Sequence, residues 1–305
     1  MRSPPVHRLS RRALLIGGSA AAGAVLLGAC GDDTSETTGT STDGTTDSDG
    51  GPLPGLALAQ FFGGPMFVAG EESRLPFGVA DQDGLLPVDE TPAALTVQVL
   101  DPTGDAVGDA IDVERHADGL PRAYFPLRVG VEAPGIYTAR TEIDGVPTEM
   151  SFQVHAASDV KVIRPGTPLP ALDTPTITDA HGVEPICTND PVCPLHEVTL
   201  AQALADRSPV ALLVATPAFC QLAICGPVLD VLLEVRAGYP GVRFLHAEVY
   251  ADPATDLDTF APVVEPLGLH FEPCLVLARA DGVVTERIDT IYDRTELQSR
   301  LDHLA

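Results

Sequence analysis

The chain has 305 residues, of which 43 are acidic and 18 are basic, and its formal net charge at pH 7 is −25. This length suggests two domains, and a hydrophobic content of 45% is enough for packed cores. The acidic balance argues against a nucleic-acid partner, because such binding needs a basic surface. Six cysteines are too few for a disulfide scaffold in a chain this long, but they are enough for a site.

Residues 1–29 have the organisation of an export signal. Four arginines precede a charge-free run of small and apolar residues at 13–29, which ends in Leu-Gly-Ala-Cys at 27–30. This segment resembles a bacterial lipoprotein signal, and Ser-Arg-Arg-Ala-Leu-Leu at 10–15 also resembles a twin-arginine export motif. The resemblance implies cleavage before Cys30 and acylation of that residue, and an uncleaved N-terminal anchor is the alternative. We therefore expect an exported protein, bound to the extracytoplasmic face of the cell membrane through a lipid on Cys30.

The segment that follows is expected to be a tether. Residues 30–52 begin with the acylated cysteine, and from Gly31 to Gly51 they contain only Gly, Asp, Thr, Ser and Glu. Such a segment has no apolar side chain to bury, so it is predicted to be disordered.

Residues 53–157 show the period-two alternation of β-strands. Apolar and polar residues alternate at 95–99, 123–129, 139–143 and 150–154, and this spacing of short strands predicts an all-β sandwich. Pro134-Gly135-Ile136-Tyr137 resembles the entry to the tyrosine corner of immunoglobulin-like domains. The resemblance implies an immunoglobulin-like β-sandwich, and its expected role is that of a spacer or binding module without chemistry of its own.

Residues 158–305 have the pattern of an α/β domain. An apolar run predicts a strand buried on both faces, Asp281-Gly282 indicates a hairpin, and Asp293 to Glu296 resemble a helix capping box. The expected elements are, in order, a strand at 210–215, a helix at 222–235, a strand at 242–249, a weak helix at 257–267, strands at 274–278 and 283–288, and a last helix from Asp293.

This order resembles the thioredoxin fold, and three motifs strengthen the resemblance. Cys220 and Cys225 follow the first strand, Gly-Pro-Val-Leu-Asp at 226–230 matches the middle of the first helix, and Glu272-Pro273 stands where the family has its cis-proline. The lead-in at 164–170 resembles the TlpA and peroxiredoxin branch. The chain departs from thioredoxin in having four residues between the cysteines and no acidic residue in the preceding strand. The implied fold is an α/β thioredoxin-like domain over residues 158–305.

The cysteine spacing sets a condition for a redox site. Five residues apart in one regular helix, Cys220 and Cys225 would have Cα atoms about 8.6 Å apart, which is beyond the usual limit for a disulfide. A bridge therefore needs Cys220 to lie before the helix or the first turn to unwind. We expect Cys220 to attack, Cys225 to resolve and Pro273 to shape the substrate cleft, with no bound cofactor and a protein or small-molecule thiol or disulfide as partner. A permanent structural disulfide is the alternative.

Three further cysteines remain after the redox pair and Cys30. Cys187 and Cys193 lie in a proline-rich loop and are predicted to form a structural disulfide, with a second exchange pair or a metal site completed by His196 as alternatives. Cys274 directly follows Pro273 and is the expected unpaired thiol. It is either a buried small hydrophobe or a third thiol near the redox pair.

Three other functions stay open from the sequence. Copper-delivery proteins of the Sco type share the fold, and they would imply Cu(I) bound by Cys220, Cys225 and His270. A redox-silent binding module with structural disulfides is another alternative. A peroxidase is less favoured, because the threonine and proline of that motif are out of register with Cys220.

Overall fold

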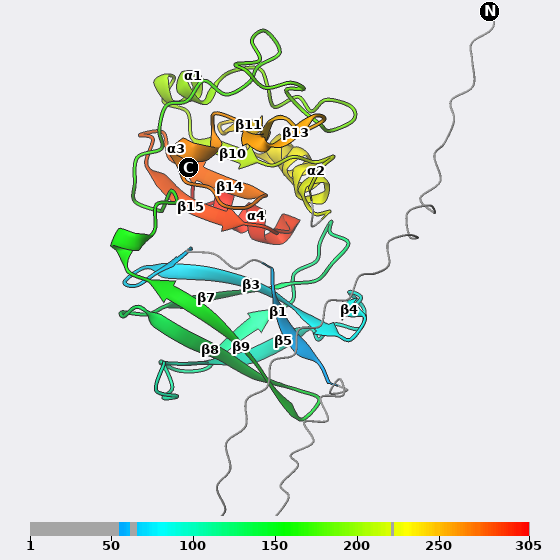
Figure 1. Cartoon of the computed structure of the whole chain (residues 1–305), viewed down its shortest axis with the longest axis vertical. Helices are drawn as coiled ribbons and strands as arrows, with labels where there is room; N and C mark the ends of the chain where they lie inside the picture. The colour runs from blue at the N-terminus through cyan, green and yellow to red at the C-terminus, as the bar shows by residue number, and fades with distance from the viewer. Residues whose placement is uncertain (1–54, 62–65, 221–222, 305) are drawn as a thin grey trace, which may run out of the picture. The chain divides into compact units, whose positions relative to one another are not determined.

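The computed structural model describes residues 55–61, 66–220 and 223–304. The predicted signal peptide, Cys30 and the tether to residue 52 lie outside the described residues. The described residues belong to one compact unit. Within it the chain is rich in β-structure, which is arranged in several sheets, and the described α-helices begin at Leu200 (Figure 1).

The first half of this unit consists of two sheets with one shared core. One sheet contains β1 (Ala57–Gln60), β3 (Glu72–Asp81), β4 (Gly84–Leu85) and β7 (Phe125–Gly130), and the other has the order β2 (Phe67–Val68), β9 (Val146–His155), β8 (Gly135–Ile143), β5 (Ala94–Leu100) and β6 (Ile111–Glu114). Burial alternates along β8 and β9, so each presents one apolar face. Side chains of both sheets meet in one apolar cluster, which includes Phe77, Leu127, Val97 and Phe152. The strands predicted from alternation are thus confirmed.

The second half is built on a mixed four-stranded sheet in the order β11 (Arg243–Ala247), β10 (Val210–Val214), β14 (Cys274–Ala278) and β15 (Val284–Asp289). Strand β10 is parallel to β11 and antiparallel to β14. Every residue of β10 and β14 is buried, because helices cover both faces of the sheet. The apolar runs therefore predicted these central strands correctly.

The helices divide between the two faces. Helices α2 (Cys225–Val235) and α4 (Arg294–Leu301) pack in one core with Leu213 of β10, whereas α1 (Leu200–Ala205) and α3 (Val264–Leu267) pack in the other core with Leu212. Two short 3-10 turns, η1 (Ala157–Asp159) and η2 (Arg236–Gly238), follow β9 and α2. No helix in the described part of the chain is long and apolar enough to cross a membrane.

Two local predictions were wrong, and one helix was missed. The segment expected to be a weak helix at 257–267 is instead strand β13 (Asp256–Phe260), paired with β12 (Tyr250–Asp252), followed by the short helix α3. Helix α2 begins at Cys225 rather than at 222. Helix α1 was not predicted, although Thr199 and Gln202 form a capping box at its start. These elements are short, so local periodicity carries little signal for them.

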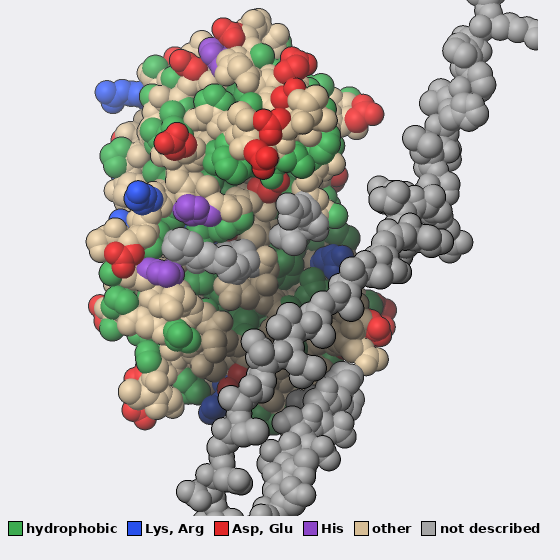
Figure 2. All heavy atoms as spheres, in the orientation of Figure 1, with side chains coloured by type: hydrophobic (Ala, Val, Ile, Leu, Met, Phe, Trp, Pro, Cys, Tyr) green, Lys and Arg blue, Asp and Glu red, His purple; other side chains and the backbone are tan. Residues whose placement is uncertain are grey.

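The surface reflects the acidic composition. Acidic side chains are spread over the face of the folded part drawn in Figure 2, and basic side chains are fewer there. Such a surface disfavours close approach to anionic polymers.

Candidate functional site

Cys220 and Cys225 form a disulfide with their Cα atoms 5.9 Å apart. Cys220 lies in the loop after β10, and Cys225 is the first residue of helix α2. The condition derived from the spacing is therefore met, because Cys220 precedes the helix. The helix begins at Cys225, so the sulfur at the helix N-terminus is that of Cys225.

The two sulfurs differ in their access to solvent. Cys220 is half-buried and its neighbour Phe219 is exposed, whereas Cys225 is completely buried beneath the first turn of α2. An incoming thiol can thus reach Cys220 more readily than Cys225. The unpaired amide groups at the start of α2 favour a thiolate at Cys225 when the bridge opens.

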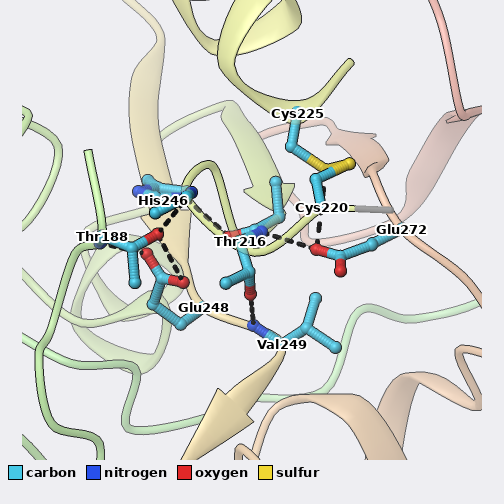
Figure 3. Close-up of a disulfide and its surroundings, with 10 residues drawn as sticks. Thr188, Thr216, Cys220, Cys225, His246, Glu248, Val249 and Glu272 are labelled. Carbon is cyan, nitrogen blue, oxygen red and sulfur yellow. Dashed lines mark hydrogen bonds between the residues drawn. A yellow bond between two sulfur atoms is a disulfide. The ribbon is translucent and has the colours of Figure 1, made fainter. Parts of the chain in front are cut away.

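A carboxylate that the sequence analysis did not assign lies beside the disulfide. Glu272 immediately precedes Pro273, and the peptide bond between them is cis. Its Oε2 atom lies 3.6 Å from Sγ of Cys225 and accepts a 2.6 Å hydrogen bond from the backbone N–H of Thr216 (Figure 3). Burial raises the pKa of Glu272 to about 7, against the effect of the Thr216 hydrogen bond. Near neutral pH this carboxyl group can therefore donate or accept a proton.

The predicted disulfide between Cys187 and Cys193 is not present in the structure. Both are buried free thiols, and two histidines lie against them. The ligand atoms of Cys187, Cys193, His196 and His246 all lie within 4.8 Å of one another, and all four residues are buried. In the loop at 187–196 the two sulfurs therefore contact imidazole side chains and do not form a disulfide.

The two thiols share hydrogen bonds with each other and with the imidazoles. A hydrogen bond from the Cys193 thiol lowers the pKa of Cys187 far below its ordinary value despite burial. The backbone N–H of Cys193 also points at the Cys187 sulfur, at 3.5 Å. Cys187 therefore has the character of a thiolate.

A buried carboxylate, that of Glu248, lies close to this cluster. Glu248 accepts hydrogen bonds from the backbone N–H and the hydroxyl of Thr188, at 2.6 and 3.2 Å. In Figure 3 Thr216 lies between Glu248 and Glu272, and its hydroxyl accepts a 3.0 Å hydrogen bond from the N–H of Val249. The backbone N–H of Ala218 donates a hydrogen bond to the hydroxyl of Thr188, so the loop that carries Cys187 contacts the segment that leads to Cys220.

Two other predicted site residues lie away from the disulfide. Cys274 is fully buried in the core on the face of the sheet opposite to that of Cys225, and burial raises the pKa of its thiol well above the ordinary value. This agrees with the buried-hydrophobe alternative and not with a third thiol at the redox pair. His270 is exposed, and among the described residues the structure does not gather it with Cys220 and Cys225 into a ligand cluster.

Some of the missed residues carried a signal in the sequence. His246 lies in strand β11 and Glu248 just after it, and the other residues from Phe244 to Val249 are apolar. Buried polar residues in such a segment are usually paired or functional. Glu272 gave no comparable signal, because its contact with Cys225 spans 47 residues of sequence.

Comparisons with known proteins add little to this description. No protein-family model and no curated protein matches the chain. One solved structure, the ZirS C-terminal domain, aligns with 50% of this chain and 99% of its own length, at 15% identity and a TM-score of 0.21. A similarity at this level supports no statement about fold or function.

Proposed function

We propose that the protein is a thiol–disulfide oxidoreductase that acts outside the cytoplasm from a lipid anchor on Cys30. The observation that carries the proposal is the grouping of a half-exposed sulfur, a buried sulfur at a helix N-terminus and a carboxyl group with a pKa of about 7. This grouping suits exchange at a dithiol, because exchange needs an accessible sulfur, and a helix N-terminus or a nearby proton acceptor helps to form the attacking thiolate. The partner is a thiol or disulfide of a protein or small molecule, and no bound cofactor is required.

The arrangement of elements supports a thioredoxin-like domain at 158–305. Strands β10, β11, β14 and β15 follow the expected order, α2 follows the first cysteine, and Pro273 has the cis bond that the resemblance implied. In the first half, the hydroxyl of Tyr137 donates a 2.9 Å hydrogen bond to the carbonyl of Ala133. That contact is the one expected of a tyrosine corner, and it supports an immunoglobulin-like sandwich as the partner-binding or spacer module.

The reaction can be written with the two sulfurs in distinct roles. In the reduced protein the Cys220 thiolate attacks a substrate disulfide, which forms a mixed disulfide and releases one substrate thiolate. The Cys225 thiol then transfers its proton to the Glu272 carboxylate, and the Cys225 thiolate attacks the Cys220 sulfur. The second substrate thiolate leaves, and the two electrons of the protein dithiol have reduced the substrate. Each step is reversible, so the same residues can oxidise a substrate dithiol.

The experiment that tests this proposal combines a potential with a trapping variant. We expect a reduction potential for the Cys220–Cys225 pair well above about −300 mV, the region typical of structural disulfides. Cys225→Ser should accumulate a mixed disulfide at Cys220, and Cys220→Ser should abolish exchange with a model disulfide. Cys274→Ala is the matched control, because it removes a thiol on the opposite face of the sheet and should leave exchange unchanged.

Two outcomes would contradict the proposal. A potential below about −300 mV would identify a structural bond and favour the redox-silent binding module. Unchanged exchange in Cys220→Ser would place the activity elsewhere.

A further inference from the structure

We propose that Cys187, Cys193, His196 and His246 bind one Zn(II) ion in a closed tetrahedral site. Two thiolates and two imidazoles are a ligand set that structural zinc sites use. The four ligands come from the loop before α1 and from strand β11, so the ion would join two segments that are distant in the sequence. This inference does not depend on the proposed redox function.

Three of the distances between the ligand atoms fit a tetrahedron around zinc. With Zn–S near 2.3 Å and Zn–N near 2.05 Å, sulfur and nitrogen ligands should lie about 3.5 Å apart. Sγ of Cys193 lies 3.4 Å from Nε2 of His196 and 3.5 Å from Nδ1 of His246, and Sγ of Cys187 lies 3.6 Å from the latter nitrogen. These three contacts match zinc coordination, and all four ligand atoms lie within 4.8 Å of one another.

The second nitrogen of each imidazole has a backbone partner. Nε2 of His246 lies 3.0 Å from the carbonyl oxygen of Ala215, and Nδ1 of His196 lies 3.4 Å from that of Pro175. A carbonyl oxygen can only accept a hydrogen bond, so these nitrogens carry the protons. The nitrogens that face the sulfurs are then free to coordinate a metal, which is the outer arrangement found for metal-binding histidines.

The site also has the closure and the electrostatics of a structural metal centre. All four residues are buried, and the set of four protein ligands leaves no open position for substrate. The N–H of Cys193 directed at the Cys187 sulfur stabilises negative charge on that ligand. Without an ion, two thiols and two imidazoles would have to share protons in a space that water does not reach.

Hydrogen bonds connect the four-ligand site to the loop that carries Cys220. The carbonyl of Ala215, which orients His246, precedes the segment that leads to Cys220. Thr188, next to Cys187, accepts a 3.2 Å hydrogen bond from the N–H of Ala218 in the same segment. Bound zinc would thereby hold this loop in place.

Metal titration of the whole protein tests the assignment. The reduced, chelator-treated chain should bind one Zn(II) in competition with a chromophoric chelator. With Co(II) as the probe it should show thiolate-to-cobalt charge transfer and the intense d–d bands of tetrahedral coordination. His196→Ala and His246→Ala should each weaken Zn(II) affinity by at least roughly 10-fold, since even outer-shell changes have that effect. His270→Ala is the matched control and should bind normally.

A measurement without substitutions covers the case in which a buried variant does not fold. Zn(II) should protect Cys187 and Cys193 of the unmodified chain from alkylation, as read by mass spectrometry of the peptides. The Cys220→Ser/Cys225→Ser protein should retain the ion, which separates this test from that of the redox proposal. A Cys187–Cys193 disulfide without stoichiometric metal would overturn the inference, and so would binding of Cu(I) with no binding of Zn(II) or Co(II).

Discussion

Glu272 is placed where a carboxylate is difficult to keep ionised. It lies beside the buried sulfur of Cys225, and burial together with the charge of Glu248 raises its pKa to about 7. Because the folded-state pKa is higher than that of the unfolded chain, stability falls as pH rises from about 4.5 towards 7. A residue that lowers stability at neutral pH but lies beside a reactive sulfur fits a role in proton transfer better than a role in folding.

Replacing Glu272 by Gln should separate these two roles. We expect resolution of the Cys220 mixed disulfide to slow by roughly 10²-fold at neutral pH, because the proton acceptor for Cys225 is lost. In the unmodified protein the rate should rise as pH increases through about 7, and the variant should lack this inflection. The measurement is the release of substrate thiol in single-turnover experiments on both sides of this pH.

The matched control is Glu265→Gln, which removes an exposed carboxylate from α3. It should leave the rate and its pH profile unchanged. Thermal unfolding of Glu272→Gln should occur at or above the temperature of the unmodified protein. If the variant instead lost stability and kept the inflection near pH 7, Glu272 would be a structural residue.

At the scale of the elements, the sequence predicted those strands and helix ends that depend on local periodicity or on a local capping residue. Strands β10 and β14 followed from uninterrupted apolar runs, and the start of α4 followed from Asp293, whose side chain accepts a hydrogen bond from the N–H of Glu296. The site was predicted only in part. The Cys220–Cys225 pair was visible from spacing, but the contacts of Cys193 with His246 and of Cys225 with Glu272 span 53 and 47 residues. Such contacts arise from the pairing of strands and not from the residues near each cysteine.

The N-terminus of α4 contains a pH-sensitive pair. Nδ1 of His116 lies 2.9 Å from a carboxylate oxygen of Asp293, the N-cap residue of the helix. Burial lowers the pKa of His116, but the hydrogen bond and the charge of Asp293 outweigh it, so the pKa is raised above 6.5. The stability that this pair contributes is therefore fully present below about pH 6.5 and is lost as pH rises through the folded-state pKa of the histidine.

Replacing His116 by Gln should remove this pH dependence. Gln can still donate to Asp293, but it does not titrate, so the difference in free energy of unfolding between the two proteins should shrink as pH rises above about 6.5. Below that pH we expect the variant to be less stable by about 1 kcal/mol, the scale of a partly exposed ion pair. Urea denaturation at several pH values measures the difference. His303→Gln, at an exposed position near the chain end, should show no such change, and a constant difference for His116→Gln would refute the linkage.

At the scale of the whole unit, one buried arginine connects the first half to the second. Arg74 of β3 makes two hydrogen bonds of 2.7 Å to the carboxylate of Glu296 in α4, and it also donates to the carbonyl of Asp289. Tyr124 donates a 2.6 Å hydrogen bond to the same carboxylate. Burial raises the pKa of Glu296, but the charge of Arg74 and these hydrogen bonds outweigh it, so the carboxyl group remains ionised. Stability from this group is present above its unfolded pKa and is lost as pH falls through the folded-state value.

Arg74→Met should be the most destabilising of these variants, because it leaves the charge of Glu296 buried without its partner. Removal of one member of a buried pair typically costs about 3–5 kcal/mol, and urea denaturation should show a loss of that size. Arg74→Met combined with Glu296→Gln should recover part of it, since no uncompensated charge then remains. Arg140→Met breaks the exposed pair with Glu149 and should cost less than about 1 kcal/mol. If Arg74→Met lost no more free energy of unfolding than this control, packing between the halves would hold the unit together without the ion pair. The loss of stability at low pH that is assigned to Glu296 would then be absent as well.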